Sequence, residues 1–275
     1  MNAVRLAFGL LTAVPTATLP RVDRLSAGRA MLLAPVTALP LVVVVAAAHR
    51  VVVAGSPPLV TAALVVALGT LYSRAMHLDG LADTADGLSA GYDAESSLRA
   101  MKASDTGPSG VAAVTLALLV EVAALASLLP TATGTGLACL AWVTSRHTLA
   151  VACRRGVPAA QPEGLGALVA GTVGPVGLAA SAAVLGAVAG TLPFLSSALA
   201  PVASVPADAE GWSATGWLAL LVAAGGLAAS ALLVRRCRRR LGGISGDVLG
   251  AGIEVALAAS LAVAALAAGA AGAAA

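Results

Sequence analysis

Three aspartates at helical spacing are the strongest candidate for chemistry in this 275-residue chain. Asp79, Asp83 and Asp86 are four and three residues apart, so a helix through them would carry all three on one face. Clustered carboxylates repel one another, and a divalent cation removes the repulsion. Mg²⁺ prefers oxygen ligands and usually combines one or two carboxylates with substrate phosphates. The spacing therefore predicts that these aspartates are metal ligands that hold Mg²⁺ against a diphosphate.

Two glycines in the same segment support a phosphate substrate. Gly80 and Gly87 each follow one of the aspartates, and glycine would let a bulky phosphate approach the backbone. The competing interpretation is an acidic segment that is only solvated. We disfavour it because the chain has few acidic residues and many of them gather here, beside a long apolar stretch.

Residues 101–110 form a second candidate element, just before another apolar stretch. Lys102, Ser104, Asp105 and Gly107 combine a cation, a hydroxyl, a carboxylate and a flexible backbone at an expected helix N-terminus. Free N–H groups at such a terminus favour phosphate. We expect these four residues to contact the substrate and Lys102 to take part in catalysis. The alternative is an ordinary helix-entry turn.

Residues 241–251 form a third element, in front of the last apolar stretch. We expect Ser245 and Gly246 to contact the substrate and Asp247 to be catalytic. Glu254 lies two turns after Asp247 on the same helical face, inside the apolar stretch, where a carboxylate is energetically costly and is a functional candidate by default. Close helix packing is the alternative explanation for the glycines of this segment.

One further cation, Arg146, lies in the middle of an apolar stretch, where a charge needs a partner. Glu121 is the candidate partner, from a different apolar stretch. We also expect Arg146 to contact a substrate phosphate. The three cysteines form no CxxC pair, so neither a disulfide framework nor a zinc site is predicted.

The composition places these elements in a membrane protein. The chain is 59% hydrophobic and 11% charged, whereas about a quarter of the residues in soluble domains are charged. A transmembrane helix needs about 20 mostly apolar residues. Seven stretches approach that length: 30–53, 59–76, 110–129, 136–152, 171–194, 215–234 and 249–271. The sequence therefore predicts an all-α, polytopic membrane bundle of about seven transmembrane helices in a single domain, residues 1–275.

Basic residues alternate between the connecting segments. They concentrate before the first stretch and in 77–109, 153–170 and 235–248, whereas 54–58 and 130–135 have none. Because basic loops stay on the cytoplasmic side, we predict a cell-membrane protein whose Asp-rich loop 77–109 and Arg/Gly-rich loop 235–248 face the cytoplasm. Topology thus explains the net charge of +3, and we predict no nucleic-acid partner. The arginines between 235 and 240 are expected to anchor this topology, or else to counter nucleotide phosphates.

These segments resemble the cobalamin synthase family. HLDGLADTADG at 77–87 and LGGISGDVLGA at 241–251 are similar to its signatures, and MKASDTGPSG at 101–110 is similar to a further family segment. Further matches, in the same order along the chain, are Leu10-Leu11-Thr12, Ser145-Arg146 and Glu163-Gly164-Leu165-Gly166. The chain departs from the family at Ala103 and Asp105, where an acidic and then a basic residue are common, but the three-aspartate cluster is intact.

The resemblance implies a Mg²⁺-dependent membrane enzyme of vitamin B12 assembly, an adenosylcobinamide-GDP ribazoletransferase. Such enzymes join adenosylcobinamide-GDP to α-ribazole, or to its 5′-phosphate, and release GMP. A ribose hydroxyl would attack the phosphorus attached to cobinamide, and either Asp247 or one of the three aspartates would be the base. The implied partners are these two substrates, the lipid bilayer and other cobalamin-assembly enzymes.

Three other functions compete with this one. A CDP-alcohol phosphatidyltransferase also places aspartates at a membrane boundary, but its D-G-x-x-A-R pattern is missing, because Asp83 follows Leu81-Ala82 and no arginine does. An ion-coupled transporter would suit the charged residues inside apolar stretches, yet transporters place their sites near the midplane. A scaffold that recruits soluble enzymes would show no metal dependence.

Overall fold

The computed structural model describes residues 2–17, 22–91, 93–103, 105–199 and 209–274, and within these ranges the protein is built from helices. The predicted all-α fold is therefore confirmed. In chain order the elements are α1 (Asn2–Leu11), α2 (Arg24–Leu33), η1 (Ala34–Ala38), α3 (Leu39–Val53), α4 (Pro58–Tyr72), α5 (Met76–Ser89), α6 (Ala94–Ala100), α7 (Pro108–Leu128), α8 (Ala132–Ala152), α9 (Gly164–Val169), α10 (Pro175–Leu199), α11 (Ala209–Leu241) and α12 (Gly246–Ala274).

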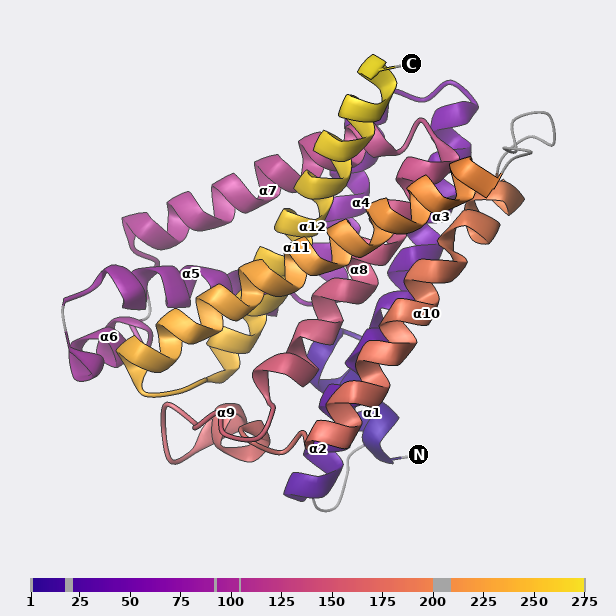
Figure 1. Ribbon diagram of the computed structural model, residues 1–275. Coiled ribbons are helices and arrows are strands. Elements are labelled where there is room, and N and C mark those ends of the chain that lie inside the picture. Colours follow the sequence, from indigo (N-terminus) through magenta and orange to yellow (C-terminus); the bar gives the residue numbers. More distant parts are fainter. Residues whose placement is uncertain (1, 18–21, 92, 104, 200–208, 275) are drawn as a thin grey trace.

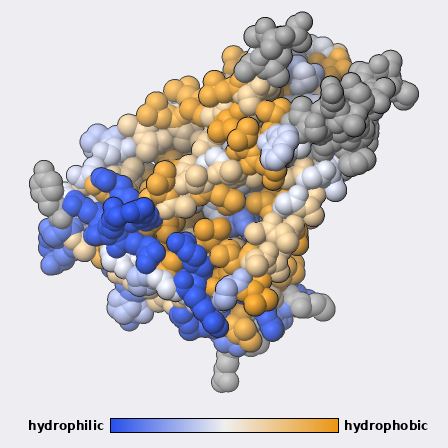
Figure 2. Space-filling model, viewed as in Figure 1, coloured by the Kyte–Doolittle hydropathy of each residue, from blue (hydrophilic) through white to orange (hydrophobic). Residues whose placement is uncertain are grey.

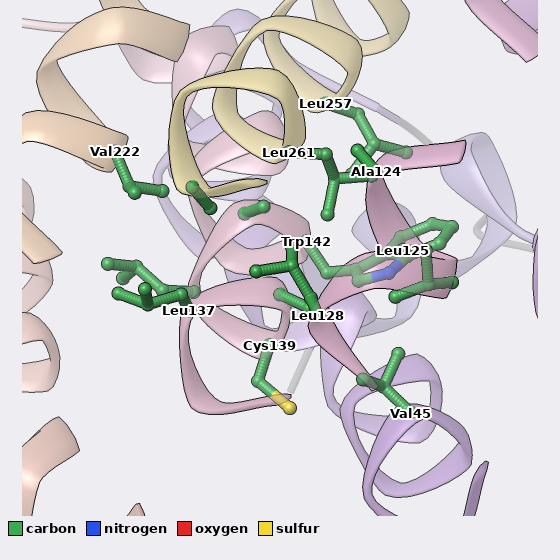
Figure 3. Close-up of a cluster of buried hydrophobic side chains, with 14 of the residues drawn as sticks. Val45, Ala124, Leu125, Leu128, Leu137, Cys139, Trp142, Val222, Leu257 and Leu261 are labelled. Atoms are coloured by element: carbon green, nitrogen blue, oxygen red, sulfur yellow. The ribbon is translucent and has the colours of Figure 1, made fainter. Parts of the chain in front are cut away.

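Two long helices, α8 and α12, form the centre of the bundle. α12 packs against α5, α7, α8 and α11, and α8 is buried along almost its whole length between α3, α10, α11 and α12. Their small residues allow this, because Ala and Gly let helix backbones approach closely. Larger side chains fill the remaining space around α8, among them Leu125, Leu128, Trp142 and Leu257 (Figure 3). The packed helices α8 and α12 therefore support the polar end of the molecule.

The structure does not confirm the predicted count of about seven spans. Four segments are long and apolar enough to cross a membrane: Arg24–Val53, Pro108–Leu128, Gly216–Leu241 and Gly246–Gly269. The number becomes five if α4 and α5 count as one broken span, and the described part of α10 and helix α1 are shorter apolar helices. Each of the seven predicted stretches is mainly helical, and residues 73–75 and 171–174 are the main exceptions. Together with their apolar surfaces, these helices identify a multi-pass membrane protein (Figure 2).

A sharp bend between α4 and α5 carries the chain out of the bundle and into the polar end. The two helices meet at 86° across Ser73, Arg74 and Ala75. Arg74 and Ala75 both have left-handed backbone angles, with φ of 55° and 56°, so the helix cannot continue through them. α5 therefore lies across the end of the bundle beside α6, instead of extending α4 (Figure 1). The expected stretch 59–76 ends earlier, at Tyr72, for this reason.

The two segments expected to be loops are largely helical. Residues 77–109 contain α5, α6 and the start of α7, and the arginines between 235 and 240 belong to the last turns of α11. Arginine has a high helix propensity, so an apolar helix that reaches water continues easily through an arginine run. Only residues 242–245 connect α11 to α12.

Candidate active site

The three aspartates lie on one helix, α5, at the polar end of the molecule. Asp79 is exposed, whereas Asp83 and Asp86 are half-buried. α5 is bent by 86° from α4, and by itself it is not among the four segments long and apolar enough to cross a membrane. Burial, followed by the charges of Asp79, Asp247 and Asp86, raises the pKa of Asp83 to about 6. The structure thus brings Asp83 within electrostatic reach of Asp247, although 164 positions separate them in the sequence.

Close contact between α5 and α12 creates this convergence. A Cβ atom on Gly80 would lie 2.6 Å from the carbonyl oxygen of Asp247, and one on Gly250 would lie 3.2 Å from the Cα atom of His77. Both glycines therefore serve helix packing. The expectation that Gly80 and Gly87 open the backbone to phosphate is wrong, because the side chain of Met101 fills the space beside Gly87.

Asp86 has a role that its spacing did not indicate. Its Oδ2 atom accepts the backbone N–H of Gly107 at 2.7 Å, and its Oδ1 atom accepts that of Gly110 at 2.8 Å. These N–H groups belong to the first turn of α7, where a negative charge is stabilised by unpaired donors and the helix dipole. The expected free N-terminus for substrate phosphate at Gly107 is therefore occupied by Asp86, which ties α5 to α7. Each oxygen of its carboxylate retains a further lone pair for a metal.

Ser245 likewise has a structural partner. Its Oγ atom accepts the backbone N–H of Val248 at 3.2 Å, which makes it the N-cap of α12. The same hydroxyl donates to Oδ2 of Asp247 at 3.2 Å. The preceding residue, Ile244, exchanges backbone hydrogen bonds with Pro158 and Ala160, so the segment after α8 holds this turn in place. Gly246 is the half-buried first residue of α12.

We predict that Ser245→Ala lowers the free energy of unfolding by about 1 kcal/mol, because the first turn of α12 loses its cap. Ser245→Thr, which keeps the hydroxyl, should change it little. Thermal unfolding of the purified protein in detergent measures both. Ser181→Ala is the matched control, since Ser181 lies within α10 and only donates back to the carbonyl of Leu178. Equal stability of Ser245→Ala and Ser181→Ala would contradict the capping role.

The second sequence element lies partly at the surface. Lys102 is exposed in the turn after α6 and lines an open groove of about 390 Å³ together with Arg99, Gln161 and Glu163. Asp105 is also exposed, in the turn before α7. Ser104 lies outside the described residues. Lys102 and Asp105 are therefore accessible to a substrate.

Beneath the aspartates lies a buried polar cluster that the sequence revealed only in part. His77 Nδ1 lies 3.6 Å from Oε1 of Glu254, and both side chains are buried. Arg146, 1% exposed, donates to Ser145 Oγ at 3.0 Å and lies 5.7 Å from the centre of the Trp142 ring. Its electrostatic partners are Glu254, Tyr72 and Glu121, in agreement with the expected pairing of Glu121 with Arg146.

Arg146 is buried within the protein, and its expected contact with a substrate phosphate stays a prediction. The guanidinium lies on α8, the most enclosed helix, and faces the carboxylates of neighbouring helices. The sequence revealed that this arginine needs a partner but not how deep it lies. The pairing of His77 with Glu254 was not predicted, although the seven-residue spacing of Asp247 and Glu254 placed Glu254 directly beneath the site.

The oxygen ligands available at the site suit a hard divalent cation that also binds oxygens of the substrate. Asp79, Asp83 and Asp247 offer carboxylate oxygens, the ligand type that Mg²⁺ prefers. Burial first, and then the neighbouring carboxylates, raise the pKa of Asp83. Over the described ranges, no three His, Cys, Asp or Glu side chains are grouped tightly enough to hold a metal ion by themselves. These residues therefore fit a Mg²⁺ ion that takes its remaining ligands from phosphate or water. They do not fit a metal site built from protein ligands alone.

Comparison with known proteins covers nearly the entire chain. The family model described as cobalamin-5-phosphate synthase matches residues 3–265. A Nocardioides protein named adenosylcobinamide-GDP ribazoletransferase is 43% identical over 263 residues, which cover 94% of this chain and 96% of the relative. Proteins of the same name from Frankia casuarinae and Corynebacterium efficiens are 38% and 34% identical, over 97% and 92% of this chain and 95% and 87% of theirs. No solved structure matches.

Proposed function

Because this chain belongs to the cobalamin-5-phosphate synthase family, we propose that the aspartates of α5 hold Mg²⁺ for the reaction named in its relatives. The enzyme is an adenosylcobinamide-GDP ribazoletransferase, which joins adenosylcobinamide-GDP to α-ribazole or its 5′-phosphate. The products are adenosylcobalamin or its 5′-phosphate, and GMP. The observation that carries the metal proposal is geometric: α5 carries Asp79, Asp83 and Asp86, and at Gly80 it packs against the backbone of Asp247.

Asp79, Asp83 and Asp86 are the proposed metal ligands. Asp79 and Asp83 have accessible carboxylates, and Asp86 is held in place by the N–H groups of Gly107 and Gly110. Bound Mg²⁺ would neutralise charge on the diphosphate, which is the main requirement of phosphoryl transfer. The protein thus contributes a preformed, negatively charged edge at the polar end of the bundle.

Positioning and proton transfer fall to the remaining residues of the site. A ribose hydroxyl of α-ribazole forms a bond to the phosphorus attached to cobinamide, and the bond from that phosphorus to the GMP oxygen breaks. The hydroxyl proton passes to a carboxylate, for which Asp247, fixed at the N-terminus of α12, and the aspartates of α5 are the candidates. Exposed Lys102 and Asp105, with Gly246, supply candidate contacts to the substrate.

We further propose that the site faces the cytoplasm. The basic segments lie on the same side of the predicted topology as the aspartates, which supports a cytoplasmic-membrane enzyme with α5 at the inner surface. Other cobalamin-assembly enzymes would deliver adenosylcobinamide-GDP and α-ribazole from that side.

A direct assay tests the proposed activity. Purified protein in detergent is incubated with adenosylcobinamide-GDP and α-ribazole, with Mg²⁺ or with EDTA. We expect GMP and adenosylcobalamin in equal amounts with Mg²⁺, and neither with EDTA. Product formation at the same rate in EDTA would rule out the metal proposal, and release of CMP from a CDP-alcohol would identify a phosphatidyltransferase instead.

A further inference from the structure

The C-terminal turns of α11 and the segment after α8 enclose an open groove that the proposed reaction does not use. Its volume is about 710 Å³, and four arginines form one part of its wall: Arg154, Arg235, Arg238 and Arg239. Ala228 and Leu232 belong to the remaining, apolar part. Over the described residues the lining contains no carboxylate, so an anion would meet no repulsion there. We call this the arginine groove.

The groove follows a single face of α11 that changes from apolar to cationic. Ala224, Ala228, Leu232, Arg235 and Arg239 recur every three or four residues, and all are exposed. Leu232 alone is 66% exposed. A ligand lying along this face would therefore contact hydrocarbon at one end and guanidinium groups at the other.

The position along α11 at which apolar residues give way to arginines matches the boundary of a membrane. α11 has 33 residues, which corresponds to about 50 Å of helix, whereas the hydrocarbon core of a bilayer is about 30 Å thick. No charged residue lies between Gly216 and Val234, and the arginine run begins directly afterwards. The arginine groove thus opens where lipid headgroups lie, at the end of the molecule where hydrophilic residues gather (Figure 2).

Two of the arginines are already held in position by uncharged partners. Arg238 donates to the carbonyl oxygen of Gly156 at 3.1 Å, and Arg154 donates to that of Val151 at 2.8 Å. A carbonyl orders a guanidinium without neutralising it. The groove therefore combines a fixed shape with positive charge, and Arg235 and Arg239 add exposed guanidinium groups at its rim.

We propose that the arginine groove binds the phosphate headgroup of an anionic phospholipid, whose acyl chain lies along Ala228 and Leu232. Guanidinium groups bind phosphate with paired hydrogen bonds, and arginines at a bilayer surface attract anionic lipids. A nucleotide phosphate shares the headgroup chemistry, but it has no hydrocarbon chain to cover the apolar half of the groove. The apolar half is what favours the lipid.

Native mass spectrometry of the detergent-purified protein tests the proposal with two lipids, phosphatidylglycerol and phosphatidylcholine. The groove variant is Arg235→Gln/Arg239→Gln, and the control is Arg5→Gln/Arg50→Gln, which removes two exposed arginines elsewhere. We expect the wild type and the control to prefer phosphatidylglycerol. The groove variant should bind it about twenty-five-fold more weakly, which corresponds to roughly fivefold for each arginine.

Three outcomes would overturn the proposal. The first is that the groove variant binds phosphatidylglycerol as tightly as the control does. The second is that the wild type binds phosphatidylcholine as tightly as phosphatidylglycerol. In a third arm, excess GMP or inorganic pyrophosphate is added to the lipid-bound protein. Displacement of phosphatidylglycerol by either soluble phosphate would show that the groove serves the nucleotide, and its retention supports the lipid.

Discussion

Asp83→Asn is expected to reduce turnover by about 10³-fold or more, while the protein still inserts and folds. Asp83 lies on α5 between Asp79 and Asp86, within electrostatic reach of Asp247, and the amide lacks the charge that a Mg²⁺ ligand requires. Stabilisation of a transferring phosphoryl group by metal is worth several kcal/mol, and each 1.4 kcal/mol corresponds to a factor of about ten. The GMP-release assay measures the effect.

A matched substitution separates metal loss from a general change of charge. Asp93 is exposed and caps α6 by accepting the backbone N–H of Ser96, a role that asparagine fills equally well. Asp93→Asn should therefore keep full activity. Activity of Asp83→Asn within a factor of about three of Asp93→Asn would show that the α5 cluster does not bind the metal.

The same substitution should stabilise the metal-free protein above pH 6. The pKa of Asp83 is raised to about 6 from 3.8, so the folded state holds its proton more tightly than the unfolded chain. Stability is therefore lost as the pH rises from about 4 through 6, when the carboxylate ionises in a partly buried position and among like charges. Because Asp83 is only partly buried and solvent screens the repulsion, we expect Asp83→Asn to recover roughly 1 kcal/mol at pH 7.

Thermal unfolding in EDTA between pH 4 and 8 checks this result. The wild type should lose stability toward pH 7 more steeply than Asp83→Asn does. A variant that is inactive yet more stable cannot owe its inactivity to misfolding. An Asp83→Asn variant that is less stable than the wild type at pH 7 would contradict the electrostatic description of the site.

Glu254→Ala is expected to destabilise the protein by about 3–5 kcal/mol. Glu254 and Arg146 are 6% and 1% exposed, and their charges compensate one another within the bundle, with Glu121 as a third member. Removing one carboxylate leaves a buried guanidinium without part of its counter-charge, and the desolvation of that cation is no longer offset. Thermal or denaturant unfolding in detergent measures the change.

An exposed ion pair in the same chain is the natural control. Arg99 and Glu95 are joined at 3.2 Å, but their side chains are 71% and 82% exposed, so Glu95→Ala should change stability little. The double variant Arg146→Met/Glu254→Leu should lose less than the sum of its single variants, because it removes both charges together. Additive losses, or equal effects of Glu254→Ala and Glu95→Ala, would contradict a coupled buried cluster.

The sequence predicted the features that depend on neighbouring residues. The apolar stretches became helices, and the four-and-three spacing of the aspartates placed them on one helix, because helix periodicity is a property of neighbouring residues. The bend at Arg74 and Ala75 was not predicted, since neither residue is a glycine or a proline and nothing in the pattern marks left-handed backbone there. That bend is what turns α5 across the end of the bundle.

Contacts between distant segments were beyond the reach of spacing arguments. Asp86 accepts hydrogen bonds from the start of α7, and Gly80 faces Asp247, because tertiary packing brings α7 and α12 against α5. An aspartate and a glycine look the same in the sequence whether they face a phosphate or a helix. Arg146 illustrates the same limit, since its need for a partner was evident but its depth within α8 depended on every neighbouring helix.

Metal binding at the α5 cluster tests the central claim most directly. Mn²⁺, a paramagnetic substitute for Mg²⁺, is titrated into purified protein with adenosylcobinamide-GDP but without α-ribazole, and free Mn²⁺ is followed by electron paramagnetic resonance. The wild type should bind Mn²⁺ and release it when Mg²⁺ is added, and Asp79→Asn/Asp83→Asn should bind at least tenfold more weakly. Equal binding by the wild type and the double variant would contradict the claim that these aspartates hold the metal.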